Sequence, residues 1–216
     1  MRTGRAEAFS DGVFAVAITV LVFGLQLPDA SNLPHPPTLV SQLLDAWPQY
    51  LAYVVSFLTI GIMWMNHHTA LAHVHRVNRP LLVLNLLLLM GVVAIPFPTE
   101  LVAKHLHDSD GSAAAVAYGL VMIVISIGFA SVWLYVVTHG EEVGAKVPPD
   151  TLRQSVPGFT GGLLAYAAGT VIAVWSATAA LVIFGLLAVY YLFEHLPAPT
   201  GEADEDAAAL YPGPAR

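Results

Sequence analysis

The 216-residue chain contains no cysteine and very little charge. Without cysteine, the fold has no disulfide framework and no thiolate ligand for a metal ion. Asp, Glu, Lys and Arg make up 11% of the residues, whereas a soluble domain carries about 25%. Hydrophobic residues account for 56% of the chain. This composition indicates an integral membrane protein rather than a soluble domain.

Charged residues are absent from five long stretches of the chain, residues 12–28, 46–75, 80–99, 111–138 and 154–193. A helix needs about 20 apolar residues to cross a hydrocarbon core roughly 30 Å thick, and most of these stretches reach that length. The last stretch holds 40 residues, which is enough for two helices and a short turn. The pattern therefore predicts an all-α membrane protein with six transmembrane helices.

Prolines and polar runs divide the chain into the expected elements. We expect helices over residues 9–27, 46–73, 80–99 and 112–138, and a helical pair from about residue 153 to 195 with its turn at 175–178. Polar loops are expected at residues 29–45 and 139–149. Ser10 or Asp11 is expected to cap the first helix. We predict one membrane domain over residues 1–199 and a disordered, low-complexity acidic tail over residues 200–216.

The positions of lysine and arginine predict the orientation of the bundle. Cytoplasmic loops of membrane proteins carry an excess of these residues. In the six-helix arrangement, seven of the eight fall on one side of the membrane and only Lys104 falls on the other. The basic side is therefore predicted to be cytoplasmic, with both termini facing it.

The sequence shows no catalytic constellation. It contains neither a G-x-S-x-G nucleophile motif nor a Walker A phosphate-binding loop. Ionisable residues within transmembrane helices mark proton relays and substrate pathways, and every expected helix centre lacks them. The chain is predicted not to be an enzyme, which leaves a passive pore or a purely structural bundle.

The most specific motif lies near the start of the first helix. Arg5, Phe9, Ser10 and Asp11 form the pattern R-x-x-x-F-S-D. If the helix extends back to Arg5, then Arg5 and Phe9 lie one turn apart on the same face. The motif alone leaves two interpretations open. It is either a helix cap with a positively charged anchor, or a functional network at the cytoplasmic mouth of the helix.

Three segments in the first hundred residues together carry a family resemblance. The R-x-x-x-F-S-D motif is followed by G-V-F-A-V-A-I-T, W-M-N-H-H begins at Trp64, and Asn85 precedes P-F-P-T at residues 96–99. These segments resemble the transmembrane protein 175 family of channels. The resemblance implies a potassium-selective channel of the bacterial plasma membrane, in which six-helix subunits form a homotetramer around a central pore. It implies no cofactor and no nucleic acid, and its expected partners are potassium ions in transit and the lipid bilayer.

The first helix lines the pore in that family, and this helix carries a matching stripe. Val16, Val20, Phe23 and Leu27 follow one another at helical spacing. By the resemblance, Val16 falls at an apolar constriction and Thr19 at a threonine layer, while Val20 and Phe23 continue the lining. A ring of apolar side chains closes a pore by dewetting. The sequence contains no TVGYG filter, and the R-x-x-x-F-S-D motif occurs once, so four chains are expected to form the pore.

Other interpretations of the stripe and of the function stay open. An apolar stripe on a membrane helix is often a packing or lipid-facing surface, and Thr19 can simply bond the carbonyl of Ala15. The alternatives to a potassium channel are a weakly selective cation or proton channel, a non-conducting membrane scaffold and a small-solute transporter.

Histidines near the end of the second helix predict polar contacts between helices rather than a metal site. His67 and His68 point about 100° apart on a helix, and no carboxylate accompanies them at ligand spacing. We expect one of them to approach Arg5, Ser10 or Asp11. The predicted signature network consists of Arg5, Phe9, Ser10, Asp11, Trp64, His67 and His68.

Amides and glycines within the apolar runs predict how the helices pack. Hydrogen bonds between helices are expected from Asn66, Asn78 and Asn85. Close helix contacts are expected at Gly119, Gly128, Gly161, Gly162, Gly169 and Gly185.

Overall fold

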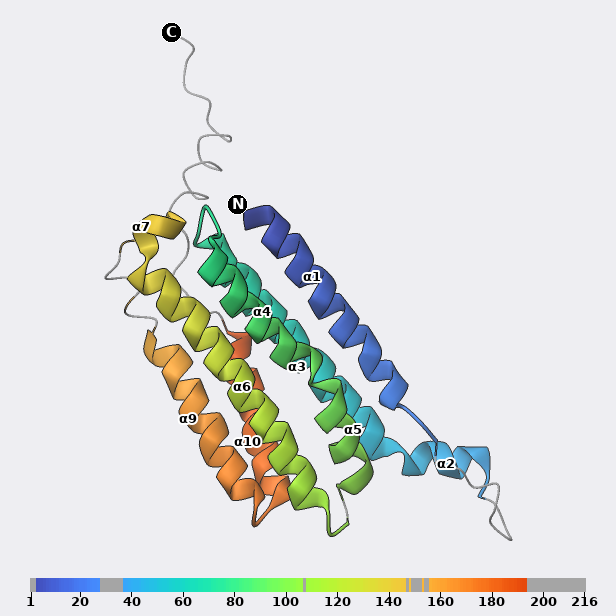
Figure 1. Cartoon of the computed structure of the whole chain (residues 1–216). Helices are drawn as coiled ribbons and strands as arrows, with labels where there is room; N and C mark the ends of the chain where they lie inside the picture. Colours follow the sequence, from blue (N-terminus) through green and yellow to red (C-terminus); the bar gives the residue numbers. More distant parts are fainter. Residues whose placement is uncertain are drawn as a thin grey trace, which may run out of the picture.

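The computed structural model describes residues 3–27, 37–106, 108–146, 148, 153 and 156–193, and these form a helical bundle (Figure 1). Its elements in chain order are α1 (Thr3–Val20), the 3₁₀ helix η1 (Leu21–Gly24), α2 (Leu39–Asp45), α3 (Trp47–Ala72), α4 (Arg79–Val93), α5 (Pro96–His105), α6 (Gly111–Thr138), α7 (Gly140–Val143), α9 (Val156–Ala173) and α10 (Ala177–Leu192). The all-α prediction is confirmed for this part of the chain. The predicted acidic tail and the expected end of the last helix near residue 195 lie outside the described residues.

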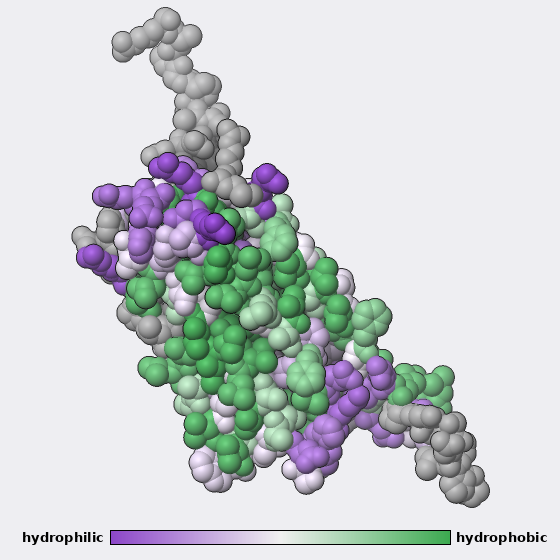
Figure 2. All heavy atoms as spheres, viewed as in Figure 1, coloured by the Kyte–Doolittle hydropathy of each residue, from purple (hydrophilic) through white to green (hydrophobic). Residues whose placement is uncertain are grey.

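Four helical segments are long and apolar enough to cross a membrane. They are Thr3–Gly24, Trp47–Ala72, Arg79–His105 and Gly111–Thr138, and the apolar segments Gly161–Ala173 and Ala177–Leu192 are shorter. Hydrophobic side chains cover the middle of the visible surface, and hydrophilic ones gather near α7 and, at the opposite end, near α2 and α5 (Figure 2). The fold is therefore that of an integral membrane protein, while the count of six spans stays a prediction.

The first helix begins at Thr3, six residues before the predicted start at residue 9. Ser10 and Asp11 therefore lie inside the helix, and the prediction that either residue caps it is wrong. A cap satisfies backbone N–H groups that only the first turn leaves unpaired. The Ser10 hydroxyl instead donates to the carbonyl of Ala6, 2.9 Å away. Because the helix includes Arg5, this residue and Phe9 share one exposed face.

The third predicted helix is divided into α4 and α5 by a break at Ala94 and Ile95, and it continues to His105 rather than ending at residue 99. Pro96 and Pro98 explain the break, because proline has no N–H to donate inside a helix. At the break, the N–H groups of Ala94 and Ile95 donate to carbonyls three residues back, at 3.1 Å each. The interruption therefore leaves these two donors paired within the membrane segment.

Most other boundaries agree with the predictions. α3 lies within one residue of its predicted bounds at each end, and α6 ends at residue 138 as expected. Ser176 caps α10 by accepting from the Ala179 N–H at 3.2 Å, and the turn between the last two helices lies at residues 174–176, slightly before the predicted 175–178. The two expected loops are wrong in part, because each contains a short helix, α2 and α7.

α6 lies at the centre of the bundle and packs against α4, α5, α9 and α10, while α1 packs against α3 and α4. Gly128 permits one close approach, because a Cβ atom there would lie 3.0 Å from Cα of Leu88 on α4. Close contacts are likewise confirmed at Gly119, Gly162 and Gly169. They are absent at Gly161 and Gly185, where an added Cβ would meet no atom within 4 Å.

Hydrogen bonds join the start of α1, the α3–α4 connection and the α7 region at one end of the bundle. Thr3 Oγ1 donates to the carbonyl of Val74 at 3.2 Å, and the N–H of Lys146 donates to the carbonyl of His73 at 2.9 Å. Arg76 and Arg79 belong to the same end, whereas Lys104 lies near the other end of the bundle on α5. Arg76 and Arg79 thus lie at the end of the bundle opposite Lys104, while the side of the membrane that each end faces stays a prediction.

Candidate functional site

α1 has one face packed into the bundle and one face that the described part of the chain leaves uncovered. Its buried residues, together with the one from η1, are Ala6, Ser10, Phe14, Ala17 and Leu21. The opposite face is exposed, with Val16 at 58% and Phe23 at 72%. From Ala8 to Phe23 this exposed face carries only one polar side chain, that of Thr19. A membrane helix with such a face must meet lipid, another subunit or an aqueous pore.

The four residues predicted to line a pore all lie on this exposed face. They are Val16, Thr19, Val20 and Phe23. Thr19 Oγ1 donates to the carbonyl of Val16 at 2.9 Å, and not to that of Ala15 as the alternative interpretation had it. Because this bond uses the hydroxyl hydrogen, the oxygen keeps its lone pairs for an incoming donor or cation.

Behind the exposed face, a chain of hydrogen bonds ties α1 to α3 and α4. Asn85 Nδ2 on α4 donates to Ser10 Oγ at 3.0 Å, and Asn85 Oδ1 lies 2.7 Å from His67 Nε2 on α3. Since the carbonyl oxygen of Asn85 can only accept, the Nε2 atom of His67 must carry the proton. The donors therefore run in one direction, from His67 through Asn85 and Ser10 to the Ala6 carbonyl. All three side chains are buried.

A second contact joins α1 and α3 on the same side of the helix. Trp64 Nε1 donates to Asp11 Oδ1 at 2.8 Å. The rings of Phe14 and His67 lie 5.3 Å apart at 55°, and the rings of Trp64 and His68 lie 6.2 Å apart at 34°. Together with the Asn85 chain, these contacts determine which face of α1 is turned toward the bundle.

The structure therefore divides the predicted signature network into two parts. Ser10, Asp11, Trp64 and His67 are brought together, and His68 lies at their edge beside Trp64. The link between Ser10 and His67 passes through Asn85, which the predicted network did not include. Arg5 and Phe9 are exposed and, within the described residues, show no side-chain hydrogen bond to this cluster.

The predicted bonds between helices from the three asparagines are confirmed. Asn66 Nδ2 donates to the carbonyl of Tyr191 on α10 at 3.0 Å, and Asn78 Nδ2 donates to the hydroxyl of Tyr135 on α6 at 2.7 Å. Asn85 bonds Ser10 and His67, as described above. One sequence signal could have placed Asn85 in the signature network. It is an amide within a run of leucines, and a polar group in such surroundings needs a buried partner such as Ser10.

Replacing Trp64 with phenylalanine is expected to lower the free energy of unfolding by about 1 kcal/mol or more, because an aromatic ring stays but the hydrogen bond to Asp11 and the pyrrole part of the indole are lost. Thermal unfolding of the purified protein in detergent micelles measures this change. Trp175→Phe is the matched control, since Trp175 is 78% exposed. Equal losses of stability in the two variants would contradict a specific Trp64–Asp11 contact.

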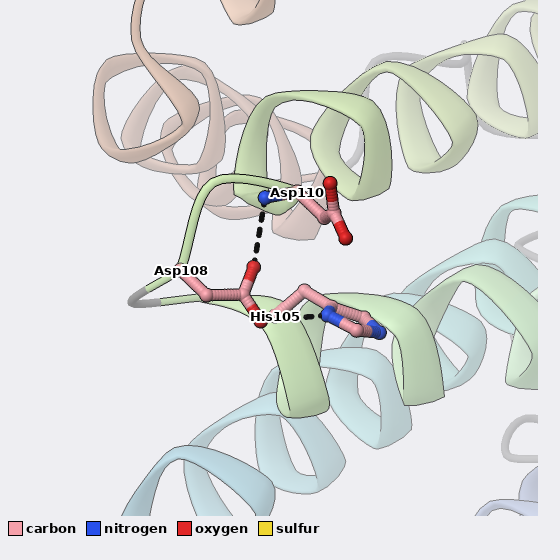
Figure 3. Close-up of side chains that lie close together, drawn as sticks. All are labelled: His105, Asp108 and Asp110. Atoms are coloured by element: carbon pink, nitrogen blue, oxygen red, sulfur yellow. Dashed lines mark hydrogen bonds and ion pairs between the residues drawn. The ribbon is translucent and has the colours of Figure 1, made fainter.

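A separate polar cluster lies between α5 and α6 (Figure 3), at the end of the bundle opposite α7 (Figure 1). His105 Nδ1 and Asp108 Oδ2 are 2.8 Å apart, and the backbone N–H of Asp110 donates to Asp108 Oδ1 at 2.8 Å. Ligand atoms of His105, Asp108 and Asp110 lie within 4.8 Å of one another. The His105 nitrogen is already bonded to Asp108, and both carboxylates are exposed. We therefore assign a hydrogen-bonded His105–Asp108 pair that closes the α5–α6 turn rather than a metal site.

The hydrogen bond from His105, helped by the Asp110 N–H, lowers the pKa of Asp108 below its ordinary value. A lowered pKa adds stability above the unfolded-state pKa, and this stability is lost as the pH falls through the folded-state pKa. His105→Ala is expected to return the pKa of Asp108 toward its ordinary value. Carboxyl-carbon NMR titration measures this shift, with His139→Ala at the other end of the bundle as control. An unchanged titration in His105→Ala would remove His105 as the cause.

Comparison with known proteins relates these features to one family. The family model described as "Endosomal/lysosomal potassium channel TMEM175" matches residues 5–96. A Streptomyces collinus protein named as a potassium channel is 44% identical over 202 residues, which cover 93% of this chain and 97% of the relative. A crystal structure of a lysosomal potassium-selective channel TMEM175 homolog from Chamaesiphon minutus matches with a TM-score of 0.77 at 35% identity, and covers 88% of this chain and 95% of that one. A Bos taurus relative named as an endosomal/lysosomal proton channel is 38% identical over 97 residues, which cover 43% of this chain and 20% of that protein. The chain belongs to the TMEM175 family, which is a family of ion channels and not of enzymes.

Proposed function

We propose that this chain is one subunit of a potassium-selective channel, in which four copies surround a central pore lined by α1. The observation that carries the proposal is the exposed face of α1, which the described residues leave uncovered and which is apolar except for Thr19. The bacterial relative that covers nearly the whole chain is named as a potassium channel, which supports potassium as the ion.

In the proposed pore, four Val16 side chains form the narrowest ring, with Val20 and Phe23 continuing the apolar lining. An ion there would lose water without gaining replacement ligands, so a dewetted ring of this kind acts as a gate. The Thr19 hydroxyl oxygens form an adjacent layer. Their lone pairs can replace part of the hydration shell, because their hydrogens are bonded to the Val16 carbonyl.

The signature contacts behind α1 have a positioning role in this proposal. Ser10 and Asp11 are bonded from α3 and α4, and these bonds hold α1 at one rotation about its axis. A rotation by one residue, about 100°, would turn Val16 away from the pore. We assign Arg5 and Phe9 to the pore mouth at the basic end of the bundle, because they extend the exposed face in that direction.

The proposed topology has six membrane spans, with α9 and α10 as the two shorter ones. The end with Arg5, Arg76, Arg79 and Lys146 faces the cytoplasm, since basic loops are retained there. The membrane is the plasma membrane of a bacterium, as the named bacterial relatives suggest.

Potassium flux into liposomes that contain only the purified protein tests this function. We expect potassium flux that exceeds sodium flux and shows single-channel steps in planar bilayers. Saturable, substrate-dependent flux without such steps would instead indicate a transporter. Absence of any ion flux from folded, tetrameric protein would indicate a scaffold and would overturn the proposal.

A proton or weakly selective cation channel is the second candidate, because the Bos taurus relative is named as a proton channel. The two candidates differ in the reversal potential. A potassium channel shifts its reversal potential with the potassium gradient, whereas the alternative follows the sodium or pH gradient.

A further inference from the structure

A cavity of about 370 Å³ lies between α3, α5, α6 and α10, away from the exposed face of α1. None of its lining residues belongs to α1 or η1. Its wall on α3 runs from Trp47 to Thr59, a rise of about 18 Å at 1.5 Å per residue. The cavity thus extends from the end of the bundle that holds α2 into the middle of the membrane segment.

The mouth of the cavity opens on the lateral surface of the bundle, between α3 and α10. Trp47, Leu51 and Val182 line it and are each about half exposed or more. These residues belong to α3 and α10, within apolar segments of the chain. Whatever enters through this mouth therefore comes from the apolar phase around the helices rather than from the aqueous ends.

The inner wall carries four hydroxyl side chains whose hydrogens are already used. Thr99 donates to the Ile95 carbonyl at 2.8 Å, which leaves Ser56 as the donor in its 2.8 Å bond to Thr99. Thr59 donates to the Val55 carbonyl at 2.8 Å. The Tyr118 hydroxyl lies beside Ser56 and Thr59, whose oxygens can accept its one hydrogen. These groups therefore have no hydrogen left to donate to a ligand.

Apart from these hydroxyls and Thr178, the described lining is apolar and uncharged. Water is poorly held over most of this space, because a buried water needs two to four polar partners and the polar atoms occupy only a small part of the lining. A polar or anionic ligand is also a poor occupant, since no cation among the described lining residues faces it and the inner hydroxyls already use their hydrogens. An apolar chain gives up no hydrogen bond on entry. It also fills a void that would otherwise leave the wall atoms without van der Waals contacts.

We propose that this cavity binds one acyl chain of a membrane phospholipid. The headgroup lies beside Trp47, because tryptophan favours the membrane interface. The chain runs along α3 toward Thr59 and Tyr118. Its length in the cavity, about 18 Å, is more than half of a hydrocarbon core roughly 30 Å thick. Binding depends on the membrane position of the bundle and not on whether the protein conducts.

Photolabelling in nanodiscs tests the proposal with phosphatidylcholine that carries a diazirine near the end of one acyl chain. Thr59 and Tyr118 are only 4% and 6% exposed, so a lipid tail can reach them only from within the cavity. Peptide mass spectrometry is expected to find labelled Thr59 or Tyr118 in addition to exposed residues such as Leu164. Labels confined to exposed residues would overturn the proposal.

Gly185→Leu gives an independent test, because a Cβ at Gly185 meets no atom within 4 Å and the leucine side chain fills the cavity. Labelling at Thr59 and Tyr118 is expected to fall at least fivefold, while labelling at Leu164 stays unchanged. Gly161→Leu is the matched control, since its Cβ also meets open space but lies outside the cavity. Undiminished labelling of Thr59 and Tyr118 in a folded Gly185→Leu protein would overturn the proposal. If that variant does not fold, the positions labelled in the unmodified protein decide the question.

Discussion

Val16→Asn is expected to increase potassium flux into proteoliposomes by about tenfold, which corresponds to a barrier lower by about 1.4 kcal/mol. The amide side chain is close to valine in size, and it gives a passing ion and its water a polar contact at the proposed constriction. A hydrophobic gate closes because its walls cannot hold water. One polar group per subunit is therefore expected to keep the ring wet.

Val171→Asn is the control for this prediction. Val171 on α9 is 57% exposed, nearly the same as Val16 at 58%, so the substitution and the exposure are matched. Its flux is expected to equal that of the unmodified protein. If Val16→Asn raised flux no more than Val171→Asn, Val16 would not be at the constriction, and the proposed lining of the pore would be wrong.

Asn85→Leu is expected to lower the free energy of unfolding by about 2–4 kcal/mol, because it removes two buried hydrogen bonds and leaves the N–H of His67 without its acceptor. Both partners of Asn85 are buried on other helices, so solvent cannot replace the lost contacts. Denaturant or thermal unfolding in mixed micelles measures the change. Potassium flux is also expected to fall, because α1 loses a contact that holds its rotation. This is expected although the variant changes no exposed residue of α1.

Asn66→Leu is the matched control, since Asn66 makes one side-chain bond that is only partly buried. Its expected cost is about 1 kcal/mol. A double-mutant cycle with His67→Leu sharpens the test, because removing both partners leaves no unpaired donor. The double variant is expected to lose less free energy of unfolding than the sum of the losses in the two single variants, by about 1–2 kcal/mol. Additive losses would show that His67 and Asn85 do not act as one unit.

The broad fold followed from the sequence because membrane helices are marked by the absence of charge, which is a local property. α3 and α6 were placed to within a residue or two on that basis. The start of α1 was missed because the charge-free run begins only after Asp11, with Arg5 and Glu7 before it, although a helix continues past charged residues once it leaves the apolar phase. α2 and α7 were missed because they are short helices within polar or charged segments, where apolar periodicity gives no signal.

The site could be predicted only in part, for a reason that Ser10 and Asn85 illustrate. Both residues could be recognised as polar groups in apolar surroundings, but they are 75 positions apart in the chain. Their contact depends on how α1 and α4 pack, and spacing along the sequence does not carry that information. The exposed stripe of α1 was predictable, because helical periodicity alone places Val16, Val20 and Phe23 on one side.

The way α1 is attached to the rest of the bundle has a further mechanical consequence. Polar contacts hold it near the start, at Thr3, Ser10 and Asp11, and the N–H of Gln26 is bonded to Gln49 at 2.9 Å beyond η1. Between these points the buried residues are apolar and restrain sliding only by packing. Converting the four residues of η1 from 3₁₀ to α geometry would change their summed rotation by about 80° and shorten them by about 2 Å. Because bonds at both ends tie this segment to α3 and α4, such a change in η1 would turn Phe23 relative to Val16 while α1 keeps its own rotation.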